Sequence, residues 1–266
     1  MKLEQFYLKF DIIAILGAFN LKKLVAYITT GYPDIDFTED VALALKEAGV
    51  DTLELGIPFS DPVADGPIIE EANLKSLQGG FTMAQLLEVS AKIAPEIDTL
   101  WMGYFNPFYK RGIETILQEA KDIGISGFII PDLPFEESLK YKEKFSENSL
   151  ALIDFVAPTD SLSRVEKILQ NSQKFVYLVA YAGITGSGKE ENLSRIIADI
   201  RNTTDTDIYI GFGVNAKTAK NKAKDVDGVI VGSAFVSIML DDSLAFDEKI
   251  KKIQEEAKII KEEINS

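Results

Sequence analysis

Residues 54–67 read ELGIPFSDPVADGP, and this stretch governs how the rest of the chain is interpreted. It opens with a carboxylate, Glu54, in an apolar run that predicts a β-strand over residues 51–56. It continues as a loop with two glycines, three prolines and two aspartates, and a helix is expected to follow at residues 68–77. An acid at the end of a buried strand, beside a constrained loop, indicates a site of chemistry.

The same alternation of strand and helix extends along the chain in both directions. Strands are predicted at residues 24–30, 51–56, 99–103, 126–130, 150–156, 175–180, 208–211 and 226–231. Helices are predicted at residues 2–10, 36–48, 68–77, 83–94, 108–123, 134–145, 161–170, 189–201, 216–224, 233–240 and 246–264. Several strands are near-continuous apolar runs, which is typical of a parallel sheet covered by helices.

Eight strand–helix units in 266 residues predict an α/β fold, a closed (β/α)8 TIM barrel, rather than an open doubly wound sheet. An open sheet usually has fewer strands at this length, and no GxGxxG follows the first strand. No linker divides the chain, so we expect one domain over residues 1–266. It has an extra N-terminal helix and a short helix before the last barrel helix.

The charge of the chain argues against nucleic acid as a partner. There are 28 basic and 42 acidic residues, a net charge of −14, and no dense basic block. No apolar run reaches the ~20 residues of a membrane span. Residues 12–19 (IIAILGAF) resemble the apolar part of a signal peptide, but acidic residues flank them, so we expect a cytoplasmic protein.

Cysteine and histidine are both absent from the sequence. Disulfides, thiolate or histidine metal ligands, cysteine nucleophiles and a Ser-His-Asp triad are therefore excluded. A general acid or base must be Asp, Glu, Lys or Tyr, which favours carboxylate chemistry.

The acids of the opening stretch differ in what they are expected to do. Leu53 and Leu55 share one face of the strand, so Glu54 points the other way, into the barrel mouth, where burial raises a carboxyl pKa. The alternative is a structural carboxylate that binds a neighbouring loop. Asp65 is the better candidate for a second acid or base, while Asp61 by itself is better explained as a turn former.

Glycine-rich turns follow the last three predicted strands. They are GITGSG at residues 183–188, Gly211-Phe212-Gly213 and Gly232-Ser233. Together with the short helix that begins at Ser233, they predict a phosphate site, because barrels often build one from these loops. Tight turns without a ligand are the alternative. The aromatic residues near strand ends are consistent either with ordinary packing or with a flat apolar substrate; they are Tyr27, Tyr104, Phe105, Tyr177, Tyr181 and Phe212.

Six motifs, in order along most of the chain, resemble the tryptophan synthase alpha subunit family. They are ELGIPFSDPVADGP (54–67), MGYFNP (102–107), IIPDLPFEE (129–137), GITG (183–186), GFGV (211–214) and VGSA (231–234). The resemblance implies a (β/α)8 lyase of L-tryptophan biosynthesis that splits indole-3-glycerol phosphate into indole and glyceraldehyde 3-phosphate by a retro-aldol step.

The resemblance also assigns roles to single residues. Glu54 matches the family's catalytic glutamate, Asp65 its catalytic aspartate, and Asp61 a residue of loop closure and partner communication. The implied substrate-binding residues are Tyr27, Tyr104, Tyr177 and Phe212 around the indole ring, Gly186, Gly213, Gly232 and Ser233 at the phosphate, and Thr185 in the loop after strand six. Ala180 and Tyr181 stand where many members have serine and arginine, which puts the ordering of that loop in doubt.

Members of this family work with a beta subunit, so an α2β2 heterotetramer is expected. The resemblance places pyridoxal phosphate on that partner and implies no cofactor in this chain. Two alternatives are another phosphate-binding barrel, such as a sugar-phosphate isomerase or epimerase, and a non-catalytic subunit that only activates a partner. The Glu54 and Asp65 pair argues against both.

Overall fold

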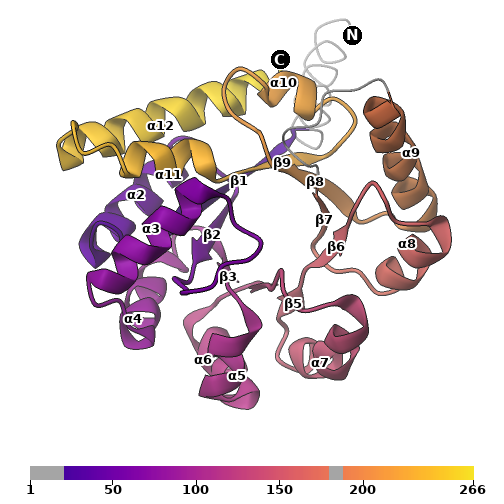
Figure 1. Cartoon of the computed structure of the whole chain (residues 1–266), viewed down its shortest axis with the longest axis horizontal. Coiled ribbons are helices and arrows are strands. Elements are labelled where there is room, and N and C mark those ends of the chain that lie inside the picture. Colours follow the sequence, from indigo (N-terminus) through magenta and orange to yellow (C-terminus); the bar gives the residue numbers. More distant parts are fainter. Residues whose placement is uncertain (1–20, 180–187) are drawn as a thin grey trace, which may run out of the picture.

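The computed structural model describes residues 21–179 and 188–266. The helix expected at residues 2–10 lies outside these ranges. In the described part of the chain, parallel strands form a central barrel and helices surround it (Figure 1). No helix in this part is long and apolar enough to cross a membrane.

One parallel sheet contains all the described strands. They are β1 Lys23–Thr29, β2 Thr52–Gly56, β3 Asp98–Met102, β4 Gly127–Ile129, β5 Ala151–Leu152, β6 Asp154–Val156, β7 Phe175–Val179, β8 Asp207–Gly211 and β9 Gly228–Val231. Their order is β5-β4-β3-β2-β1-β9-β8-β7-β6. Because β5 and β6 are separated only by Ile153, the two ends of this list meet, and the sheet forms a nearly closed barrel.

Helices connect successive strands and pack on the outside of the barrel (Figure 1). They are α2 Ile35–Glu47, α3 Pro67–Gln78, α4 Met83–Ile93, α5 Phe105–Arg111, α6 Ile113–Ile123, α7 Phe135–Glu147, α8 Leu162–Leu169, α9 Gly188–Thr203, α10 Ala219–Lys222, α11 Ser233–Met239 and α12 Phe246–Glu263. The (β/α)8 prediction is confirmed, and so is the short helix before the last one, which is α11.

Two predicted elements are interrupted, one by strand pairing and one by a glycine. The strand expected at residues 150–156 pairs with β4 through its first half and with β7 through its second half, so it is recorded as β5 and β6. The helix expected at residues 108–123 is divided into α5 and α6 at Gly112, whose φ of +95° a helix cannot contain. The helix expected at residues 216–224 shortens to α10.

The apolar core has two parts, inside and outside the strands. The inner part fills the barrel and consists of Val25, Leu100, Ile129, Ala151, Ile153, Phe175, Tyr209 and Ile230. The larger outer part lies between the strands and the helices. Filling the barrel centre leaves the space for a ligand at the ends of the strands.

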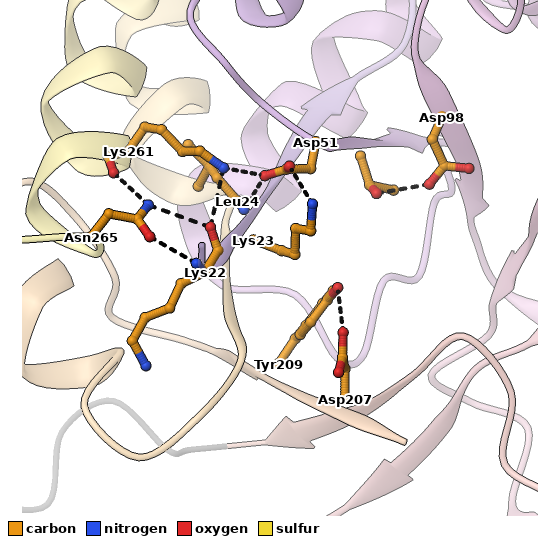
Figure 2. A network of polar contacts seen from close by, with 10 residues as sticks. Lys22, Lys23, Leu24, Asp51, Asp98, Asp207, Tyr209, Lys261 and Asn265 are labelled. Atoms are coloured by element: carbon orange, nitrogen blue, oxygen red, sulfur yellow. Dashed lines mark hydrogen bonds and ion pairs between the residues drawn. The ribbon is translucent and has the colours of Figure 1, made fainter. Parts of the chain in front are cut away.

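Polar side chains stabilise the amino-terminal ends of the strands (Figure 2). Asp51, just before β2, accepts hydrogen bonds from the backbone N–H of Leu24 (2.8 Å) and from Lys261 of α12. Thr52 donates to Asp98 at the start of β3 over 2.7 Å. This end of the barrel is therefore stabilised by the protein's own side chains, and the opposite end carries the candidate site.

Candidate active site

Glu54 lies in the middle of β2 and points into the barrel. It is level with Tyr27 on β1 and with Leu100 on β3, and Leu100 belongs to the inner core. Leu53 and Leu55 belong to the outer core. The orientation predicted from the alternation along β2 is therefore confirmed.

The Glu54 carboxyl group is almost completely buried, with 2% of the residue exposed. Its Oε1 atom has no hydrogen-bond partner among the described residues. Burial, with a smaller contribution from the charge of Asp65, raises the pKa of Glu54 to about 8. At neutral pH this group is therefore mostly protonated and able to donate a proton.

Asp65 lies in the loop between β2 and α3, where the chain turns into the helix. Its backbone N–H donates to the carbonyl of Pro62 over 2.9 Å, and Pro67 occupies the first position of α3. The Asp65 side chain is half-buried and accepts a hydrogen bond from Asn73 Nδ2 (3.2 Å). These contacts hold the carboxyl group beside the barrel mouth.

The Asp65 carboxyl group, unlike that of Glu54, has hydrogen-bond donors beside it. Burial raises the pKa of Asp65 to about 6, while the neighbouring hydroxyl of Tyr104 and carboxamide of Asn73 limit the rise and the charge of Glu70 adds to it. At neutral pH Asp65 is mostly ionised and Glu54 mostly protonated. Such a pair can act at the same time as acid and as anion.

Tyr104, at the start of α5, anchors the loop that carries Asp65. Its hydroxyl accepts a hydrogen bond from the backbone N–H of Ala64 (3.0 Å), and its ring stacks on Phe59 with 5.2 Å between ring centres. Asp61 of the same loop is exposed and accepts a hydrogen bond from the Ser60 hydroxyl over 2.6 Å. Tyr104 and Asp65 thus lie together, whereas Asp61 faces outward.

Tyr27 and Tyr177 each lie across a glycine that ends the next strand of the sheet. A Cβ atom on Gly56 would lie 2.2 Å from the Tyr27 hydroxyl, and one on Gly211 would lie 2.4 Å from the Tyr177 hydroxyl. Only glycine permits so close an approach of ring and backbone. Both rings therefore lie against the ends of strands at the barrel mouth.

The two described glycine turns lie on adjacent strands, β8 and β9, which pair with each other. After β8, Phe212 and Gly213 both have positive φ, +74° and +70°, and Phe212 is 40% exposed. Such a backbone is uncommon for an aromatic residue. After β9, Gly232 caps α11, and Ser233 is the first residue of that helix. Thr185 and Gly186, with Ala180 and Tyr181, lie outside the described residues.

Asn73 is a site residue that the sequence did not indicate. It lies on α3, is 1% exposed and contacts Asp65. A signal was present, because helical spacing puts Asn73 on the same face as the buried Ala72 and Ser76. A buried amide needs a polar partner, but the sequence does not say which one. In the part of the chain that the structure describes, no cluster of three or more acidic side chains is arranged to hold a metal ion.

Comparisons with known proteins agree on one family. The model of the family described as tryptophan synthase alpha chain matches residues 14–265. The tryptophan synthase alpha chain of Wolinella succinogenes is 58% identical over 251 residues, 94% of this chain and 98% of that protein. Among solved structures, tryptophan synthase subunit alpha from Campylobacter jejuni is similar with a TM-score of 0.81 at 34% identity, covering 89% of this chain and 96% of that one. A ligand-free crystal structure of tryptophan synthase from M. tuberculosis has a TM-score of 0.83 at 27% identity, covering 94% of this chain and 95% of the matched chain.

Proposed function

The chain belongs to the tryptophan synthase alpha chain family, whose lyase activity cleaves indole-3-glycerol phosphate in tryptophan biosynthesis, and we propose that Glu54 and Asp65 carry this reaction. One observation supports the assignment above all. Two carboxyl groups lie near enough for the charge of Asp65 to raise the pKa of Glu54, and the pKa values of Glu54 and Asp65 are raised to about 8 and about 6. One is a proton donor and the other an anion at the same pH.

Cleavage begins with a proton transfer to indole C3. The bond from C3 to the glycerol chain breaks only after C3 becomes tetrahedral. Protonated Glu54 gives its proton to C3, and positive charge develops at the ring nitrogen. The Asp65 carboxylate accepts a hydrogen bond from the ring N–H and stabilises that charge.

The second step breaks the carbon–carbon bond and restores the enzyme. Glu54, now a carboxylate, removes the proton from the glycerol hydroxyl next to the breaking bond. The oxygen's electron pair forms the aldehyde of glyceraldehyde 3-phosphate, and the electrons of the broken bond return to the indole ring. Glu54 is again protonated, so one residue serves as acid and then as base.

The remaining residues of the site are proposed to bind the substrate. The rings of Tyr27, Tyr177 and Phe212 would surround the indole, while Tyr104 would both line the site and anchor the Asp65 loop. Gly213, Gly232 and Ser233 would bind the phosphate, since the first backbone N–H groups of α11 have no partner within the helix. Thr185 and Gly186 complete the predicted set.

We further propose a beta subunit as the partner, in an α2β2 assembly. Aromatic surface near the site supports this. Phe105 and Tyr109 of α5 lie 5.7 Å apart between ring centres, Tyr109 is 64% exposed, and Val63 in the Asp65 loop is 82% exposed. Apolar groups at this end of the barrel suit a protein partner. Asp61, exposed in the same loop, is proposed to communicate with it.

The expectations from the sequence about cofactor, location and domain organisation are also proposals. Pyridoxal phosphate is assigned to the beta subunit, and no cofactor to this chain. A cytoplasmic location and a single domain over residues 1–266 are also proposed.

An indole-release assay, with and without a beta subunit, tests the proposal. Glu54→Gln keeps the shape of the side chain but cannot exchange a proton, so we expect a loss of at least 100-fold in kcat. A Glu54→Gln protein that released indole at the normal rate with beta subunit present would disprove the mechanism. Glu255→Gln on α12, with a side chain 58% exposed, is the matched control and should be fully active.

A further inference from the structure

We infer that Asn73 is a positioning residue for Asp65: its carboxamide holds one carboxylate oxygen and leaves the other for the substrate. The inference rests on the proposed role of Asp65 as acceptor of the indole N–H. It adds a residue outside the barrel strands, on α3, to the machinery of the reaction.

The contact joins a loop to a helix. Asp65 lies in a loop, whereas Asn73 lies near the middle of α3 and is 1% exposed. Asn73 Nδ2 donates to Asp65 Oδ2 over 3.2 Å. One turn further along, Ser76 Oγ donates to the carbonyl of Thr30 at the end of β1 over 2.7 Å, which fixes α3 against the barrel. Through these two bonds, α3 holds Asp65 in place relative to the barrel.

The other end of the Asn73 carboxamide argues against a purely structural role. Its Oδ1 atom is buried and has no hydrogen-bond partner among the described residues. Asparagine is also unfavourable inside a helix, and an unpaired buried carbonyl adds a desolvation cost. If this position served packing alone, leucine would give a more stable helix than asparagine. The contact with Asp65 is the feature that explains an amide here.

The charges around Asp65 explain what this donor does. Acidic or phenolic groups face it from β2 (Glu54), from α3 (Glu70), from the start of α5 (Tyr104), from β1 (Tyr27) and from β7 (Tyr177). No cation acts on Asp65 from the part of the chain that the structure describes. Neutral donors must therefore favour the ionised form, and Asn73 is one of the two that do so, together with Tyr104.

The test replaces Asn73 by leucine, which has a similar shape and no donor. The Asp65 pKa is measured by ¹³C NMR on protein labelled at aspartate carboxyl carbons, with the Asp65 signal assigned by its absence in Asp65→Asn. We expect the pKa of Asp65 to rise by about one unit. In indole release, the loss of kcat/KM should grow as the pH falls, to roughly fivefold at pH 6, and be small at pH 8.

Ser90→Ala on α4 is the matched control, because it removes a buried hydrogen bond, donated by Trp101 Nε1 over 2.9 Å, without touching α3 or Asp65. It should lower stability and leave the Asp65 pKa unchanged. Should Asn73→Leu not fold, Asn73→Ala removes the same donor with a smaller side chain. An unchanged Asp65 pKa in either Asn73 variant would overturn the inference. A raised pKa with an unaltered activity profile supports the positioning contact and instead refutes the proposed role of Asp65.

Discussion

Lys174 Nζ, at the start of β7, lies 2.8 Å from Asp98 Oδ2, at the start of β3. These strands are not neighbours in the sheet, so the ion pair spans the amino-terminal end of the barrel. Lys174 has a φ of +63°, a backbone conformation that is uncommon for lysine. The contact therefore joins two parts of the barrel at the end opposite the site.

The Lys174–Asp98 pair predicts a stability that depends on pH. Burial alone would raise the pKa of Asp98, but hydrogen bonds from Lys174 and Thr52 and the lysine charge hold this pKa below its usual range. Because the folded-state pKa is the lower one, the stabilisation is present above the unfolded value of about 4 and is lost as the pH falls further.

Asp98→Asn should therefore lower the free energy of unfolding by about 1 kcal/mol at pH 7, since the pair is partly exposed. The difference from the parent should shrink as the pH falls below about 4. Urea unfolding at several pH values measures it. A difference that stayed constant across this range would show that the Asp98 charge contributes nothing.

Glu54 should have the opposite effect on stability. Its folded-state pKa of about 8 lies above the ordinary value of 4.5, so folding opposes ionisation of this group. The parent protein therefore loses stability as the pH rises from about 4.5 to about 8. Glu54→Gln, which cannot ionise, should be the more stable protein at pH 8, by on the order of 4 kcal/mol, and similar to the parent at pH 4.5. Urea unfolding at the two pH values checks this. Equal stabilities at pH 8 would contradict the raised pKa.

The pair of pKa values also predicts a bell-shaped dependence of kcat/KM on pH. Activity should fall below pH about 6, where Asp65 becomes protonated, and above pH about 8, where Glu54 loses its proton. Indole release measures the profile. The substrate phosphate also ionises near pH ~6, so the acidic limb is assigned by repeating the profile with Asp65→Glu. A limb that does not move in that variant belongs to the substrate.

The sequence was sufficient for the barrel and for the direction of Glu54, because both follow from local patterns. Leu53 and Leu55 fix the outward face of β2, and the strand–helix alternation recurs along the chain. The break at Ile153 was not predictable, since it depends on pairing with two different strands. Asn73 was missed for the same reason. Its helical face could be predicted, but its contact with Asp65 depends on how the preceding loop folds back.

Lys249 is expected to stabilise α11, the helix that begins at the proposed phosphate site. The lysine is 3% exposed, and its Nζ donates to the carbonyl of Met239 at the end of that helix over 2.7 Å. Lys249→Met keeps most of the side-chain packing but loses this bond to the negative end of the helix. The free energy of unfolding, measured by thermal unfolding, should fall by about 1–3 kcal/mol.

Lys251 of the same helix provides the control for Lys249. Its side chain is 75% exposed, and its ion pair with Glu255 is long, at 3.9 Å. Lys251→Met should therefore change the free energy of unfolding by less than ~0.5 kcal/mol. Equal effects of the two substitutions would show that the Lys249 bond has no special contribution.

Gly56 is predicted to be required because the Tyr27 ring occupies the space of its side chain. A Cβ atom there would lie 2.2 Å from the Tyr27 hydroxyl and 2.3 Å from Cζ, which is far inside contact distance. Gly56→Ala must push the ring away from the β2 end, where Tyr27 is proposed to contact the indole. We expect a loss of about 2 kcal/mol in stability and a higher KM for indole-3-glycerol phosphate.

Gly66→Ala, where a Cβ meets nothing within 4 Å and φ is −90°, should keep the parent's stability. In a Tyr27→Ala background the Gly56→Ala change should cost less than ~0.5 kcal/mol, because the clash has been removed. An equal cost with and without the Tyr27 ring would place the strain in the backbone of β2 instead.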